Sequence, residues 1–138
     1  MQVELKRLND AVHFQAEGGT AKVQVHIDGS PEIGGEGLGV RPMELVLMAL
    51  GSCSSLDLIN ILKKQKQIIR DFSVSVTGER ADAIPAVFTK IHMVFTLTGD
   101  IDPAKAEKTA ELAVKKYCSV HDMLAAGGVE ITYEVKLK

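Results

Sequence analysis

The chain of 138 residues carries 16 Lys and Arg against 18 Asp and Glu, which gives a formal net charge of −2. Without a large basic field, neither nucleic acid nor an anionic membrane surface is an expected partner. The length suits a single domain, residues 1–138, with a core of its own. Charged residues stand near the N-terminus where a signal peptide needs an apolar run, so we expect a cytoplasmic location.

Residues 2–28 predict an antiparallel meander of three strands. Apolar and polar residues alternate in three short segments, and Asn9–Asp10 and Gly18–Gly19 make the connections. This alternation predicts one buried face and one wet face. A glycine-rich segment, 29–41, comes next. Its spacing matches neither common phosphate-binding pattern, so it predicts a flexible connection.

Residues 42–66 predict one long helix around which the rest of the chain is organised. From Met43 to Leu50 every residue except Glu44 is apolar, and a helix that is apolar on all sides is buried. At the standard rise it would extend about 37 Å, too far for one subunit of this size to cover. The helix therefore predicts a homodimer. Glu44 and Asp57 bracket an apolar run that is too short for a membrane span.

The second half of the chain predicts a hairpin, two helices and a last strand. The hairpin strands run from Phe72 to about Arg80 and from Val87 to Leu97. Asp102 and Pro103 suit the cap and first position of a helix. The apolar stripe of this helix consists of Ala106, Ala110, Ala113, Val114 and Tyr117. A helical turn over 119–125 and a last strand over 129–137 are predicted after it. The order β-β-β-α-β-β-α-α-β predicts an α+β fold with antiparallel sheets.

The chain has two cysteines, one on each major helix. Cys53 lies near the middle of the long helix, and Cys118 continues the apolar stripe of the second one if that helix persists. In a reducing compartment such a pair does not form a permanent disulfide. It is then two buried thiols without a role, a metal pair, or a redox pair. Neither cysteine has a second ligand at Cys-x-x-Cys spacing, and Cys118 with His121 alone does not make a metal site.

We therefore expect no metal and no cofactor. His121, three residues after Cys118, is expected to line a pocket or to reach solvent.

Two segments around these cysteines resemble motifs of the OsmC/Ohr family of small cysteine-based peroxidases. Pro42-Met-Glu-Leu-Val-Leu-Met-Ala-Leu-Gly-Ser-Cys53-Ser is similar to the central-helix motif, and Lys116-Tyr-Cys118-Ser-Val-His is similar to the second-cysteine motif. The resemblance implies an intertwined homodimer with two active sites at the subunit interface. It implies that Cys53 attacks an organic hydroperoxide, that Cys118 resolves the product to a disulfide, and that an external thiol reduces it in oxidative-stress defence.

The resemblance also implies partners that activate the thiol. Peroxidases of the family use an arginine from the N-terminal sheet region, held by a carboxylate ten residues before the cysteine. Here Met43 occupies that position, and Glu44 lies about half a turn away from Cys53 on the helix. Arg7 and Arg41 are the candidate arginines. If neither reaches Cys53, the same dimer is a non-enzymatic redox sensor or a binder of apolar ligands.

Overall fold

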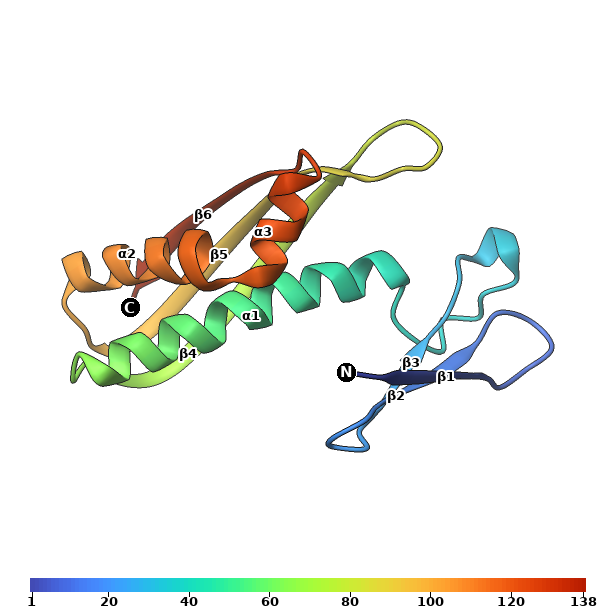
Figure 1. Ribbon diagram of the computed structural model, residues 1–138, viewed down its shortest axis with the longest axis horizontal. Helices are drawn as coiled ribbons and strands as arrows, with labels where there is room; N and C mark the ends of the chain where they lie inside the picture. Colours follow the sequence, from blue (N-terminus) through green and yellow to red (C-terminus); the bar gives the residue numbers. More distant parts are fainter. The chain divides into compact units, whose positions relative to one another are not determined.

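The computed structural model describes residues 1–138, which form two compact units, Met1–Val46 and Leu47–Lys138. The elements are β1 (Val3–Arg7), β2 (Phe14–Gly18), β3 (Gln24–Ile27), α1 (Pro42–Lys64), β4 (Ile68–Arg80), β5 (Phe88–Asp100), α2 (Pro103–Leu112), α3 (Ser119–Ala126) and β6 (Glu130–Leu137) (Figure 1). Short turns of other helix types, η1 (Pro31–Ile33) and η2 (Ala113–Tyr117), complete the order. The predicted element order and the α+β class are confirmed.

The N-terminal unit contains the predicted meander, with antiparallel strands in the order β1-β2-β3. The register aligns Leu5 with Ala16 and Ala16 with Val25, so these side chains share one face. The expected burial of this face is wrong for the single chain, because Val3 and Leu5 are 67% and 57% exposed. Three short strands supply too few side chains to cover their own apolar face.

The glycine-rich segment is held by a buried carboxylate and is more than a flexible connection. Asp28 accepts hydrogen bonds from the backbone N–H groups of Gly29 (2.8 Å), Glu36 (2.9 Å) and Leu38 (3.0 Å). The bonds from Leu38 and Glu36 are the main reason that the pKa of Asp28 lies below its usual value, against the opposing effect of burial. Asp28 thus folds the loop back on itself ahead of α1.

The C-terminal unit is built on a mixed sheet in the order β4-β5-β6. β4 and β5 form the predicted antiparallel hairpin, whereas β6 runs parallel to β5. The prediction of a purely antiparallel arrangement is therefore wrong for the last strand. The helical connection after β5 carries the chain back along the sheet, so that Lys90 and Glu130 are paired near the starts of their strands. A parallel pair requires such a long crossover.

The helix α1 supplies much of the core of this unit. Leu50, Leu58 and Leu62 are fully buried, and a Cβ on Gly51 would meet Val76 of β4 at 2.8 Å. By length and composition α1 also satisfies the criterion for a membrane span, with a mean hydropathy of 1.8, so Glu44 and Asp57 do not exclude one on those grounds. The core helix of a water-soluble protein satisfies the same criterion.

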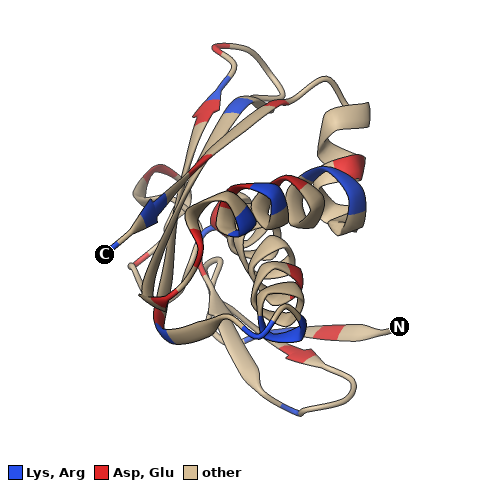
Figure 2. Cartoon of the chain, turned by 90° about the vertical axis from the view of Figure 1, so that its left-hand side faces the viewer, with Lys and Arg blue, Asp and Glu red and all other residues tan.

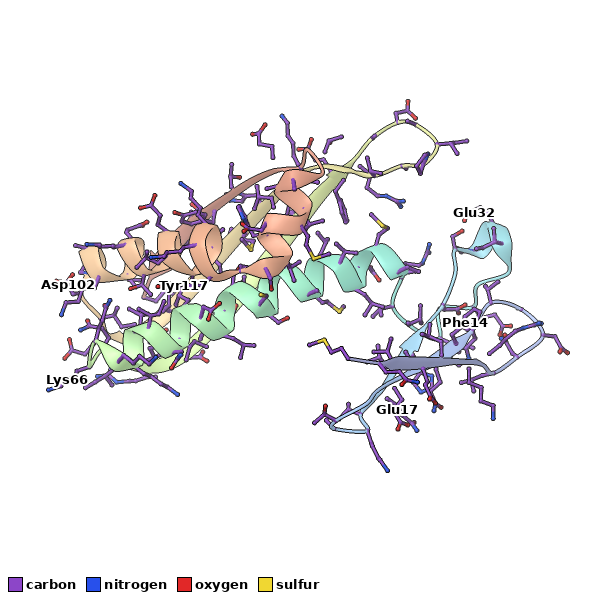
Figure 3. The ribbon with its side chains drawn as sticks, in the orientation of Figure 1. Phe14, Glu17, Glu32, Lys66, Asp102 and Tyr117 are labelled. Atoms are coloured by element: carbon purple, nitrogen blue, oxygen red, sulfur yellow. The ribbon has the colours of Figure 1, made fainter.

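The second helix begins and packs largely as predicted. The Asp102 carboxylate accepts a hydrogen bond from the Lys105 N–H at 2.8 Å, so it caps α2 (Figure 3). The predicted stripe is buried at Ala106, Ala110, Ala113 and Val114, but Tyr117 is exposed. Basic and acidic residues are interspersed along the helices and strands, as the composition suggests (Figure 2).

Tyr117 is exposed because the helix changes its winding before it ends. Residues Ala113–Tyr117 form a turn of π-helix, in which the Cys118 N–H bonds to the Ala113 carbonyl at 3.1 Å. The wider turn shifts the phase of the side chains that follow. The spacing of four residues between Val114 and Cys118 therefore does not place their side chains on one face of a regular α-helix.

Candidate thiol-pair site

Cys53 lies in the middle of α1, two residues after the glycine that lets this helix approach β4. The fit between Gly51 and Val76 fixes the depth of α1 on the sheet at this point. Cys53 itself is partly exposed, and its neighbours Ser54 and Ser55 are buried. The helix thus presents the Cys53 thiol at the border between the core and the surface of the C-terminal unit.

Cys118 lies at the junction between the π turn and α3. Its backbone is extended (φ −74°, ψ 103°), so the residue is the N-cap of α3, and its sulfur accepts a hydrogen bond from the His121 N–H at 3.3 Å. The side chain is only 1% exposed. The positive end of a helix and a backbone donor both favour a negative charge on a sulfur placed here.

The structure brings the two cysteines together, although 65 positions separate them in the chain. Both are free thiols, and Cys53 lies close enough to Cys118 to influence the pKa of its thiol. Burial raises the pKa of the Cys118 thiol above its usual range; the Ser54 hydroxyl and the His121 N–H oppose this effect, and Cys53 adds to it. Cys118 is therefore protonated at neutral pH.

Ser54 is a member of the site that the sequence did not reveal. Its Oγ is buried and is the one buried side-chain N or O atom without a formed hydrogen bond. It lies beside the Cys118 thiol and lowers the pKa of that thiol, without the geometry of a complete hydrogen bond. Serine next to a helical cysteine is a weak sequence signal, because serine on a helix usually bonds to the backbone of its own helix.

The other predicted site residues are distributed between the two units. Arg7, Arg41 and Glu44 belong to the N-terminal unit, where the Glu44 carboxylate accepts a hydrogen bond from the Arg41 N–H at 2.7 Å. This bond fixes the first turn of α1 in the manner of a capping box. His121 contributes its backbone N–H to Cys118, while its ring pairs with the Asp122 carboxylate at 3.3 Å.

No group of three or more His, Cys, Asp and Glu side chains is arranged to hold a metal ion. The chemistry available at the thiol pair is that of two sulfur atoms. One is partly exposed, and the other is buried beside a hydroxyl and a backbone donor. Such a pair is arranged to form and break a disulfide if an oxidant reaches Cys53.

The fold of this chain is similar to the folds of several solved structures. A hypothetical protein from Aquifex aeolicus is 30% identical, with a TM-score of 0.81 over 99% of this chain and 96% of that one. An organic hydroperoxide resistance protein OsmC from Legionella pneumophila has a TM-score of 0.72 over 99% and 97% of the two chains, at 18% identity. A long helix together with two small sheets is the fold that this chain shares with these OsmC proteins.

The sequence comparisons agree with the fold. The model of the OsmC-like protein family matches residues 34–134, and the chain belongs to that family. Protein YhfA of Escherichia coli is 43% identical over 96 residues, which are 68% of this chain and 72% of YhfA. The match to the family model includes both cysteines and the strands that support them.

Proposed function

We propose that this protein is a thiol-dependent peroxidase that reduces organic hydroperoxides through Cys53 and Cys118. The observation that carries the proposal is the facing pair of thiols on α1 and at the start of α3, one partly exposed and one buried. Membership of the OsmC-like family supports a general role in oxidative stress. A cytoplasmic location suits both the peroxidase activity and the role in oxidative stress, because reducing conditions there keep the two thiols free between reactions.

In the proposed reaction the Cys53 thiolate attacks the terminal oxygen of the hydroperoxide. The O–O bond breaks, the alcohol leaves, and Cys53 becomes a sulfenic acid. The Cys118 sulfur then attacks the Cys53 sulfur, water leaves, and a disulfide forms between them. An external dithiol returns two electrons and restores both thiols.

The surroundings of Cys53 on α1 support an organic substrate. Ala49 precedes the cysteine by four residues and Leu56 follows it by three, so both lie on the same helix face. Leu56 is 71% exposed in the single chain. An apolar surface beside the thiol favours an alkyl or aryl hydroperoxide over hydrogen peroxide, because burial of the organic group adds binding free energy.

Stopped-flow oxidation of the reduced protein tests this function. We expect cumene hydroperoxide to oxidise Cys53 at least about tenfold faster than hydrogen peroxide, since burial of an aromatic group is worth more than one factor of ten. A dithiol such as dihydrolipoamide should sustain turnover. A disulfide that forms slowly with both peroxides, with no catalytic turnover, would favour the non-enzymatic redox sensor.

The functional unit in this proposal is a homodimer. A single chain leaves two apolar surfaces uncovered, one on the N-terminal sheet (Val3, Leu5, Val25) and one on α1 (Met48, Leu56). A second copy related by a two-fold axis can cover both surfaces at once, because each copy brings the same pair of patches. A homodimer would therefore cover both apolar surfaces without a second kind of protein.

The N-terminal sheet offers a matched pair of variants for testing the dimer. Leu5→Glu places a charge on the apolar face, whereas Lys6→Glu changes the adjacent residue, which points to the opposite face. We expect sedimentation velocity to report a dimer for the wild type and for Lys6→Glu, and mainly a monomer for Leu5→Glu. A monomeric wild type at micromolar concentration would contradict the dimer.

A further inference from the structure

We propose that Cys118 is the leaving group when an external thiol reduces the Cys53–Cys118 disulfide, and that the Ser54 hydroxyl stabilises the thiolate released there. The inference rests on the proposed disulfide and adds the direction in which that bond is opened. Three observations carry it: the unequal exposure of the two sulfurs, the unsatisfied Ser54 hydroxyl, and the position of Cys118 at the start of α3.

Access to the two sulfurs is unequal. Cys118 is 1% exposed, whereas Cys53 lies at the border of the core and is partly exposed. A thiolate must approach the sulfur that it attacks along the line of the disulfide bond, from the side away from the leaving sulfur. In the single chain the external thiol therefore reaches Cys53 and not Cys118, so that the bond breaks toward the buried side.

Burial raises the pKa of the Cys118 thiol and by itself makes this sulfur a poorer leaving group, but the groups around Cys118 offset part of that effect. The His121 N–H already donates to it at 3.3 Å, and the N-terminus of α3 points its positive end toward it. Ser54 adds a buried hydroxyl that has no other partner. A thiolate at Cys118 would satisfy this hydroxyl, since a charged acceptor forms a stronger hydrogen bond than a neutral thiol does.

The neighbouring serines show that the freedom of the Ser54 hydroxyl is specific to this position. Ser52 donates to the Met48 carbonyl at 2.7 Å, and Ser55 donates to the Gly51 carbonyl at 2.6 Å. Both hydroxyls are thus used within α1, in the usual manner of helical serines. Of the three serines, only Ser54 has a hydroxyl that makes no hydrogen bond within α1, and this hydroxyl lies beside Cys118.

The reductive half-reaction can be written with every electron pair assigned. One thiolate of a dithiol attacks the Cys53 sulfur and forms a mixed disulfide, while the electron pair of the broken bond passes to the Cys118 sulfur. The second thiol of the same reductant then attacks its own partner sulfur in the mixed disulfide and releases Cys53. The dithiol leaves as a cyclic disulfide, and its two protons are returned to the protein thiols or to solvent.

Trapping the mixed disulfide tests the direction of attack on the wild-type protein. The disulfide is first formed with diamide, so that the assay needs no hydroperoxide. A brief reaction with 2-mercaptoethanol is quenched in acid, free thiols are alkylated after unfolding, and the peptides are identified by mass spectrometry. We expect the adduct on Cys53 and the alkylated thiol on Cys118.

An adduct found mainly on Cys118, or divided equally between the two, would overturn the inference. Failure of diamide to form any disulfide would remove the thiol pair altogether, and with it both proposals. A disulfide that opens as expected in a protein inert to hydroperoxides would leave this inference standing and refute the peroxidase. The two proposals are thus distinguished by separate measurements.

The role of Ser54 is tested with Ser54→Ala against Ser55→Ala as the matched control. Loss of a hydrogen bond to a charged sulfur should slow disulfide reduction by roughly tenfold in Ser54→Ala, with little change in Ser55→Ala. As a second readout, thiolate absorbance at 240 nm is titrated in a Cys53→Ser background, where Cys118 is the sole cysteine. Ser54→Ala should raise the pKa of Cys118 further above its usual value; equal pKa values and equal rates would exclude Ser54.

Discussion

Replacing Cys53 by serine is expected to abolish peroxide-dependent turnover, a loss of roughly a thousandfold or more, because the remaining thiol, Cys118, is buried and burial raises its pKa. Turnover is measured as oxidation of a dithiol by cumene hydroperoxide under multiple-turnover conditions. The partly exposed position of Cys53 on α1 makes it the thiol that a substrate meets first. Turnover that persists in Cys53→Ser would contradict the assignment.

Cys118→Ser is the matched variant, because it retains the attacking thiol and removes the resolving one. It should reduce about one equivalent of hydroperoxide per chain and then stop with Cys53 as a sulfenic acid, which dimedone captures and mass spectrometry detects. Full multiple turnover in Cys118→Ser would show that an external thiol resolves the sulfenic acid directly. Cys118 would then have no role in catalysis.

Arg7→Ala is expected to slow the oxidation of Cys53 by about tenfold or more at neutral pH. The register of β1 and β2 aligns Arg7 with Phe14, and Arg7 lies on the face that also carries Leu5, two residues earlier in the strand. We propose that a second copy covers this face, and a guanidinium enclosed there requires an anionic partner. A cation close to a thiol favours its charged form, so the Cys53 thiolate is the partner that the proposed reaction would use.

Two controls make the Arg7 prediction specific. Lys6→Ala removes a neighbouring positive charge from the opposite face of β1 and should leave the rate unchanged. Arg41→Ala tests the other candidate arginine, which stands directly before α1. The rate constant with cumene hydroperoxide is measured as a function of pH for all three variants. A loss of rate in Arg41→Ala alone would transfer the role to Arg41, and no loss in either would favour the redox sensor.

The sequence alone determined the local elements of this protein and the identity of its thiols. Alternation of apolar and polar residues located the strands, and Asp102 followed by Pro103 located the start of α2, because caps and periodicity are local properties of the chain. The two cysteine motifs indicated the family, which the match over residues 34–134 established.

The tertiary structure decided what depends on contacts between distant residues. The direction of β6 follows from the length of the helical crossover, and Tyr117 is exposed because a π turn shifts the phase of its helix. Ser54 looked like its neighbours Ser52 and Ser55 until the packing of α1 placed its hydroxyl beside Cys118. Periodicity describes one element at a time, whereas this site joins the middle of one helix to the beginning of another.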